Sequence, residues 1–170
     1  MQHTKQAGSG TPGEGATVVI RPFESGDQPT FQSLNEAWIR RYFALEPKDY
    51  EILGDPENAI LRQGGQILFA IVEGLPVGCC ALIPHGPAAY EIGKMAVRED
   101  YQGQGIGRKL MEAAIEAGRS LGARQLYLET HHSLDPALRL YESVGFIRLP
   151  AGERAPSQYS RGDVQMEKWL

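Results

Sequence analysis

The chain has 170 residues, a formal net charge of −4 at pH 7 and a hydrophobic fraction of 42%. This length is typical of one domain with a single sizeable core. The mildly acidic balance excludes a chain-wide positive field that would attract nucleic acid or an anionic membrane surface. The only cysteines, Cys79 and Cys80, are adjacent and cannot form an unstrained disulfide. No segment approaches the ~18 apolar residues that span a bilayer. We therefore expect a cytoplasmic protein with reduced thiols.

The N-terminal segment differs from the rest of the chain. Residues 1–16 are rich in glycine and carry no large apolar side chain after Met1. Such a segment buries too little surface to offset the entropy lost on ordering. We expect a disordered tail at residues 1–16 and one folded domain over residues 17–170.

The first ordered elements are a strand and two helices. A β-branched run predicts a strand at residues 17–21. Asp27 offers an N-cap for an amphipathic helix whose apolar residues extend to Phe43. Residues 48–62 predict a turn followed by a second short helix.

Three apolar, β-rich runs follow. Residues 66–72 and 77–83 are joined by residues 73–76, which have turn chemistry, so they predict an antiparallel hairpin. Residues 90–97 predict the next strand, which leads into a glycine-rich turn.

The second half alternates helices and strands. We expect helices at residues 106–121 and 136–144, and strands at residues 124–130, 146–149 and 163–169. The final strand ends in apolar residues that could support a homodimer: Met166, Trp169 and Leu170.

The glycine-rich turn has the chemistry of an anion site. It reads Gln102-Gly103-Gln104-Gly105-Ile106-Gly107-Arg108. Backbone N–H groups can converge there without Cβ obstruction, and the helix N-terminus adds partial positive charge, so the turn could hold a pyrophosphate. The alternative is a tight strand-to-helix turn with no ligand.

Two familiar nucleotide-binding loops do not fit this turn. A P-loop requires a hydroxyl residue after its lysine, whereas Lys109 is followed by Leu110. The dinucleotide fingerprint is G-x-G-x-x-G with a ribose acid further on, whereas this run is G-x-G-x-G. ATP and NAD are therefore not the expected ligands.

Two segments together resemble the GNAT superfamily of N-acetyltransferases. The glycine run resembles the family's [Arg/Gln]-x-x-Gly-x-[Gly/Ala] pyrophosphate loop, and Met95-Ala96-Val97 resembles the strand end before it. About 30 residues on, residues 136–146 resemble the segment A-x-x-L-Y-E-x-x-G-F, and this catalytic half is similar to ribosomal-protein N-terminal acetyltransferases. The resemblance covers residues 17–170. It implies an α/β fold of the α+β type, with a mostly antiparallel central sheet, two splayed parallel strands and flanking helices.

The same resemblance implies acetyl-CoA as co-substrate. Its pantetheine would pair with the backbone at Met95, Ala96 and Val97, and its pyrophosphate would accept from the turn at Gln102, Gly103, Gln104, Gly105, Ile106, Gly107 and Arg108. The coenzyme arm would enter where residues 90–97 and 125–130 splay. Family members often carry an Asn after the second splayed strand, and here the sequence departs from the pattern. We expect His131 to replace that contact by hydrogen bonding.

Acetyl transfer to an amine needs a base for the amine and an acid for the departing thiolate. Tyr141 matches the family's acid position, although an aromatic cap on the helix is the structural alternative. Glu129 and Glu91 are the candidate bases, because strand alternation can turn either toward the cleft. The alternative is that both are solvated strand carboxylates and the base is a water or several groups.

Other chemistry is not favoured by the sequence. His131 and His132 should point opposite ways in extended chain and have no zinc-like partners nearby, so no metal is expected. Cys79 and Cys80 lie in an apolar strand and are read as small core residues rather than nucleophiles.

The acceptor is expected to be a primary amine of a small molecule, amino acid or peptide. Candidate residues around it are Phe31, Trp38, Tyr42, Tyr159 and Arg161. A noncatalytic acyl-CoA-binding regulatory module is the alternative function.

Overall fold

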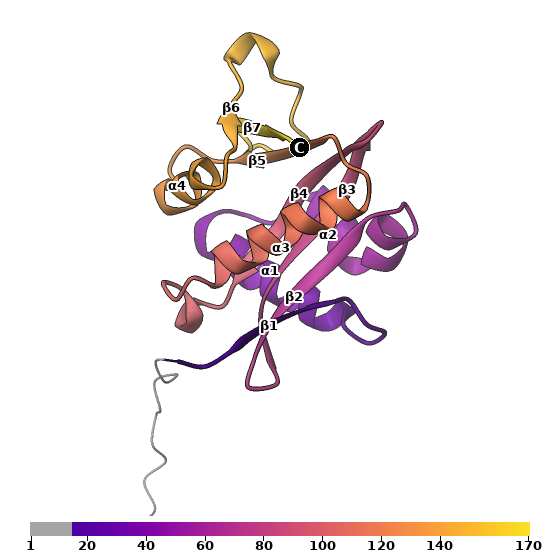
Figure 1. Cartoon of the computed structure of the whole chain (residues 1–170), viewed down its shortest axis with the longest axis vertical. Helices are drawn as coiled ribbons and strands as arrows, with labels where there is room; N and C mark the ends of the chain where they lie inside the picture. The colour runs from indigo at the N-terminus through magenta and orange to yellow at the C-terminus, as the bar shows by residue number, and fades with distance from the viewer. Residues whose placement is uncertain (1–14) are drawn as a thin grey trace, which may run out of the picture.

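The computed structural model describes residues 15–170 and shows one seven-stranded mixed sheet flanked by helices (Figure 1). The strand order is β1-β2-β3-β4-β5-β7-β6. The strands are β1 (Val18–Pro22), β2 (Gln66–Val72), β3 (Leu75–Gly86), β4 (Ala89–Val97), β5 (Gln125–Thr130), β6 (Ile147–Arg148) and β7 (Val164–Trp169). The tail predicted for residues 1–16 lies outside the described residues except for its last two.

Helices cover both faces of the sheet. They are α1 (Gln28–Tyr42), α2 (Pro47–Gly54), α3 (Ile106–Ser120) and α4 (Asp135–Ser143), with short helical turns at Glu57–Leu61, Glu99–Tyr101 and Ala151–Glu153. In Figure 1, α3 lies on one face of the sheet, and α1 and α2 lie on the other. No helix within residues 15–170 is long and apolar enough to cross a bilayer.

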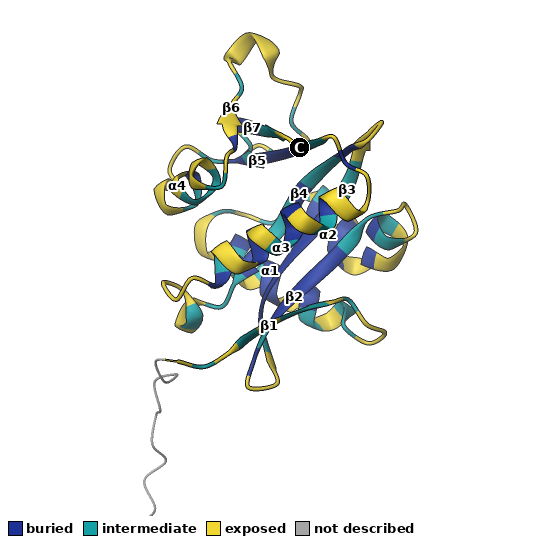
Figure 2. Ribbon diagram, viewed as in Figure 1, coloured by how far each residue is buried: buried dark blue, intermediate teal, exposed yellow. Residues whose placement is uncertain are grey.

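The core is divided by the sheet into two clusters (Figure 2). Helix α3 buries Ile106, Leu110 and Ala114 against one face, because residues four apart fall on one side of a helix. Helix α1 buries Phe31 and Ile39 against the other face. The sheet is therefore covered on both sides, as its apolar strands require.

The first four strands form an antiparallel meander. The predicted hairpin of β2 and β3 is confirmed, and its turn consists of Glu73 and Gly74, with φ of 50° and 77°. Two successive left-handed residues match the twist of a two-residue hairpin. The predicted mixed, mostly antiparallel sheet with flanking helices is likewise confirmed.

Three local predictions needed correction. Residues 48–62 contain two helical segments, not one. The strand expected at residues 146–149 is reduced to the two residues of β6. The side chain of Asp27 does not cap α1. Its carboxylate instead accepts a hydrogen bond of 2.7 Å from Arg21, and a charged donor competes well for a carboxylate.

The parallel strands β4 and β5 are paired over only three residues, from Ala89↔Gln125 to Glu91↔Tyr127. Beyond this point the strands diverge. Between Ile92 and Val97, the edge of β4 facing β5 has no strand partner among the described residues. The fold therefore opens where the sequence placed the splayed strands.

Candidate active site

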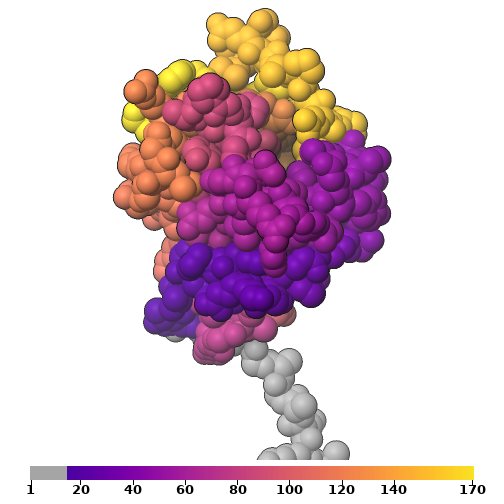
Figure 3. Space-filling view, turned by 90° about the vertical axis from the view of Figure 1, so that its right-hand side faces the viewer, coloured from indigo at the N-terminus to yellow at the C-terminus, as the bar shows by residue number. Residues whose placement is uncertain are grey.

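A cavity of about 690 Å³ lies where β4 and β5 part. Its walls come from α1, α2, the end of β3, β4, β5 and the loop between β6 and β7. Figure 3 shows the surface hollowed where the purple N-terminal segments, the pink β3–β4 region and the gold C-terminal loop meet. The volume is ample for a small amine or the end of a peptide.

Alternation along β5 decides which side chains reach this cavity. Leu126 and Leu128 are buried in the core under α3, whereas Tyr127 and Glu129 line the cavity. Glu91 of β4 lies opposite Tyr127 in the register and lines the cavity as well. The structure thus brings both candidate bases to one site.

Glu91 has the properties of a general base. Its carboxylate makes no hydrogen bond or ion pair with any residue in the described part of the chain, and it faces the cavity. Burial and then the nearby Glu129 raise the pKa of Glu91 to about 7, although Lys94 and Lys48 act in the opposite direction. A carboxyl group with this pKa can take up and release a proton near neutral pH.

Glu129 is held by hydrogen bonds. Its Oε1 accepts from the hydroxyl of Tyr127 at 2.7 Å and from the amide of Gln165 at 3.4 Å, and its Oε2 accepts from Ser157 at 2.6 Å. These donors occupy both oxygens, so Glu129 is less free than Glu91 to accept a proton from an amine.

Tyr141 lies on α4 and lines the cavity. Burial, followed by the nearby Cys80, raises the pKa of Tyr141 to about 12. The phenol therefore stays protonated at neutral pH and can donate a hydrogen bond or a proton. Its ring also contacts Phe146 edge to face at 6.4 Å.

The glycine turn has the backbone that its sequence predicts. Gly103 and Gly105 have φ of 76° and 78°, and the space at their missing Cβ atoms is open. The amides of Gln102 and Gln104 fold back onto the carbonyls of Val97 and Asp100 at 3.0 and 3.5 Å, which braces the turn. The turn leaves its backbone accessible at the start of α3.

Two side chains of this turn face away from a ligand. Ile106 is buried at 2% exposure and packs in the core, so only its backbone can serve the site. Arg108 donates to the hydroxyl of Ser143 at 2.7 Å, which ties the first turn of α3 to the end of α4.

A buried ionic cluster on the cavity wall was not predicted from the sequence. Asp49 of α2 is fully buried and accepts from Lys94 at 2.7 Å and from Arg161 at 2.6 and 2.9 Å. Burial alone would raise the pKa of Asp49, but the hydrogen bonds from Arg161 and Lys94 lower it to about 2. Tyr159 lies against both cations, and its hydroxyl accepts from Lys94 at 3.0 Å.

Only Lys94 among the residues of this cluster has a sequence feature that could have indicated its unusual position. Gly93 precedes it inside an apolar strand, and an interior glycine often marks a bulge. Asp49 carries no such signal, because its partner Arg161 is 112 positions away.

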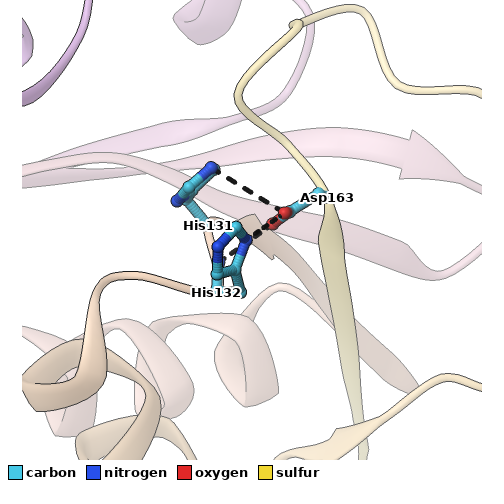
Figure 4. Close-up of side chains that lie close together, drawn as sticks. All are labelled: His131, His132 and Asp163. Carbon is cyan, nitrogen blue, oxygen red and sulfur yellow. Dashed lines mark hydrogen bonds and ion pairs between the residues drawn. The ribbon is translucent and has the colours of Figure 1, made fainter.

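His131, His132 and Asp163 form a second polar cluster (Figure 4). The prediction that the two rings point opposite ways is wrong. Their centroids lie 4.2 Å apart, because the strand ends at Thr130 and the chain turns there. One ligand atom from each residue lies within 4.8 Å of the others, and such a set suits a transition metal by type.

Hydrogen bonds fix the orientations of the side chains in this cluster. The backbone N–H of Ser133 donates to Nδ1 of His131 at 3.2 Å, so the proton of the neutral ring is on Nε2, which faces Asp163 at 3.8 Å. His132 bonds Asp163 through its ring and its backbone N–H. Burial would raise the pKa of Asp163, but these bonds from His132 lower it. His131 also lines the cavity.

Of the predicted acceptor residues, three lie at the cavity: Trp38, Tyr159 and Arg161. Phe31 does not, because it is fully buried against Phe69 in the core under α1. Tyr42 is 41% exposed, and its ring lies tilted against that of Trp38 with the ring centroids 5.2 Å apart. It does not line the cavity.

Both cysteines are fully buried, as expected for core residues. Burial raises the pKa of the Cys79 thiol to about 12 and raises that of Cys80 as well. A buried thiol of this kind is inert as a nucleophile.

The family model described as "Acetyltransferase (GNAT) family" matches residues 31–146, which is more than half of the chain. The chain belongs to the GNAT family of acetyltransferases. This confirms the resemblance seen in the sequence.

Individual GNAT proteins are similar to the chain at different levels. It is 39% identical over 139 residues to N-alpha-acetyltransferase 30 of Saccharomyces cerevisiae, covering 78% of this chain and 77% of the yeast protein. It is 46% identical over 52 residues to the [ribosomal protein bS18]-alanine N-acetyltransferase of Escherichia coli, covering 31% of this chain and 35% of that protein.

A solved structure shows the same fold. The acetyltransferase YncA of Salmonella typhimurium, solved with its cofactor acetyl-CoA, is 19% identical, with a TM-score of 0.70 over 91% of this chain and 95% of that one. At this identity the match concerns the fold alone.

Proposed function

We propose that this GNAT protein transfers acetyl from acetyl-CoA directly to a primary amine, with Glu91 as general base and Tyr141 as general acid. The observation that carries the proposal is the position of Glu91. It is a carboxylate without a partner among the described residues, it faces a cavity of about 690 Å³, and Tyr141 lines the same cavity. We further propose that residues 17–170 form one acetyltransferase domain.

The residues that fit the coenzyme are those of the glycine turn and the open edge of β4. Gly103 and Gly105 leave room at their Cβ positions, and the turn opens α3, so its N–H groups suit a pyrophosphate. The edge of β4 around Met95 and Val97 can pair with amide groups as an added strand does. His131, on the cavity wall, is the proposed hydrogen-bonding replacement for the family's Asn.

The proposed chemistry follows from the two pKa values. Glu91, with a pKa of about 7, takes a proton from the ammonium form of the acceptor, which frees a lone pair for attack on the thioester carbon. The new C–N bond forms as the C–S bond breaks, and the acylated nitrogen releases its second proton, which balances the proton taken up by the departing sulfur. Tyr141, with a pKa of about 12, donates a hydrogen bond or a proton to the departing sulfur. The thioester supplies the activated acetyl group, so no covalent enzyme intermediate is required.

The charges around the cavity support an amine as the acceptor. The wall carries the carboxylates of Glu51, Asp55, Glu91 and Glu129. Its cations are already paired, Lys94 and Arg161 with the buried Asp49 and Lys48 with Glu51. A site with surplus negative charge attracts a cation. We propose a small-molecule, amino-acid or peptide amine, and the name of the yeast relative favours the amino terminus of a polypeptide.

The test combines binding with turnover. Thermal unfolding is followed during titration with acetyl-CoA, with NAD and ATP as controls, because a ligand that binds only the folded state raises its stability. The same sample is then tested for release of free thiol with amines, amino acids and peptides of varied N-terminus. Stabilisation by acetyl-CoA alone, with thiol release for one acceptor class, is expected. Stabilisation without release for any acceptor would favour a noncatalytic acyl-CoA-binding module, and no stabilisation would overturn the proposal.

A further inference from the structure

Lys94 has a backbone conformation that is unusual for its residue type. Its φ is 50°, in the left-handed region, which is strained for a residue that carries a Cβ. The strain coincides with a β-bulge: between the pairs Cys79↔Ala96 and Ala81↔Gly93, one residue of β3 faces two residues of β4. Strained residues of this kind concentrate where the position of a side chain matters for function.

The bulge changes the face of the sheet to which Lys94 points. Strict alternation would put residue 94 on the opposite face from Glu91, three positions earlier. In the structure both side chains line the same cavity. The ammonium of Lys94 is fixed there by Asp49 at 2.7 Å and by the hydroxyl of Tyr159 at 3.0 Å, and the side chain is only 6% exposed.

We propose that Lys94 is a positioning residue for acetyl transfer, which holds a fixed, desolvated positive charge at the cavity that Glu91 faces and so lowers the pH above which Glu91 can act as base. The inference rests on the proposed function, because it assigns Lys94 a role through Glu91. Lys94 itself contacts neither reacting atom and is not a catalytic residue.

Lys94 does more than neutralise Asp49. Arg161 already binds both oxygens of Asp49, at 2.6 and 2.9 Å, so the carboxylate keeps a charged partner without the lysine. Arg161 is shared with Glu46 at 3.1 Å, and Lys94 is the second buried cation of the cluster. Lys94 lies on the same strand as Glu91, and both residues line the cavity.

Other charged and titratable groups act on the same carboxyl group. Those that line the cavity around Glu91 are Glu129 and Tyr127 from β5, Lys48 and Glu51 from α2, Asp55 after α2, His85 from β3, His131 after β5, Tyr141 from α4, and Tyr159 and Arg161 from the β6–β7 loop. Of these, Glu129 raises the pKa of Glu91, and Lys48 acts with Lys94 to lower it.

Lys48 differs from Lys94 in one decisive respect. Its side chain is 33% exposed and bound to Glu51 at 3.1 Å, so water and its partner screen its charge. Lys94 is almost entirely excluded from water. In such an environment of low dielectric constant, a charge acts over a longer range than it does in water. Lys48 is therefore a matched control for the loss of a lysine at the same cavity.

The experiment measures the protonation of Glu91 directly. The side-chain carboxyl carbon is followed by ¹³C NMR as a function of pH in the full chain without coenzyme, and its signal is assigned by its loss in Glu91→Gln. In Lys94→Met the titration midpoint should move up by at least about 0.5 pH unit. Methionine is also unbranched at Cβ, so the strain of the left-handed backbone is similar in both proteins. Lys94→Arg should restore the midpoint, and Lys48→Met should leave it near that of the wild type.

Each result of the NMR titration either supports or overturns the proposed role of Lys94. A midpoint that stays unchanged in Lys94→Met, or moves equally in Lys48→Met, overturns it. If Lys94→Met does not fold, Lys94→Gln replaces it, since glutamine is neutral and can still donate to Asp49. Absence of thiol release in the wild type would overturn the proposed function alone, because the NMR titration does not depend on turnover. With turnover present, the acid limb of kcat/KM should follow the NMR midpoint.

Discussion

The hydroxyl of Tyr127 donates a hydrogen bond of 2.7 Å to Oε1 of Glu129, two residues further along β5. Both side chains lie on the cavity face of the strand, because residues two apart share a face. Burial, and then the hydrogen bond to Glu129, raise the pKa of Tyr127. The pair therefore consists of a neutral phenol and a carboxylate acceptor, and Glu129 serves as a fixed negative charge near Glu91.

Replacing Glu129 should alter the pH dependence more than the rate. In Glu129→Gln the like charge that raises the pKa of Glu91 is removed, so the acid limb of kcat/KM should move to lower pH. At pH 8, where Glu91 is already largely ionised, kcat should remain within about tenfold of the wild type. A pH profile of kcat/KM from pH 5 to 9 checks this. A loss of activity at all pH values, with disappearance of the limb, would instead make Glu129 the base.

Replacing Glu91 should remove the base itself. In Glu91→Gln kcat should fall by about 10²-fold or more, because general-base catalysis contributes this much, and the limb near pH 7 should disappear. The dissociation constant of acetyl-CoA should be unchanged, since Glu91 is not among the residues proposed to bind the coenzyme. Matched variants at Glu51, an exposed carboxylate of the same cavity, should keep the limb.

Much of the fold follows from local patterns in the sequence. Each of these patterns extends over only a few neighbouring residues. They are the helical period of α3, the apolar runs of β2 and β3, and the glycines of the turns. The splay between β4 and β5 came from the family resemblance rather than from any local pattern. Phe31 shows the limit of periodicity, because the same helical spacing fits a core residue and a cavity residue. Only the packing of α1 on the sheet distinguishes them.

The candidate site was less accessible to prediction, for a physical reason. Glu91, Glu129 and Tyr141 were predicted as candidates and all three line the cavity, yet nothing in the sequence separates the two carboxylates. The distinction arises from Ser157 and Gln165, which are far along the chain and bind Glu129. Similarly, alternation assigns Lys94 to the wrong face because it assumes a strand without a bulge.

Tyr141 offers a test of the acid. Tyr141→Phe removes the hydroxyl but keeps the ring that packs on Phe146, so folding should be preserved. Turnover should fall by about 10²-fold, with little change in the affinity for acetyl-CoA. Steady-state kinetics and a coenzyme titration separate the two effects. Unchanged turnover would reduce Tyr141 to an aromatic residue that caps α4.

The glycine turn can be tested against a glycine with the same backbone. Gly105→Ala places a Cβ in the proposed pyrophosphate site on a residue with φ of 78°. The affinity for acetyl-CoA should fall at least about tenfold, because the added methyl group both strains the left-handed backbone and obstructs the proposed pyrophosphate site. Gly122, at the other end of α3, has φ of 80° and equally open surroundings. Gly122→Ala should cost similar stability without weakening coenzyme binding, and equal affinities in the two variants would contradict the assigned site.

Asp49 should make the stability of the protein depend on acid pH. Its pKa is about 2 in the folded state against an ordinary 3.8, so its ionised form contributes about 2 kcal/mol of stability above pH 4. That contribution is lost as the pH falls from about 4 toward 2, where the folded state also becomes protonated. Asp49→Asn leaves Lys94 and Arg161 buried without their carboxylate, and at pH 7 it should lower the free energy of unfolding by about 3 kcal/mol. Urea unfolding at pH 7 and at pH 2.5 should show this difference shrinking at the lower pH. Glu51→Gln, at an exposed carboxylate of the same helix, should change stability by less than about 0.5 kcal/mol at either pH, and a similar loss in both variants would show that the buried cluster adds no special stability.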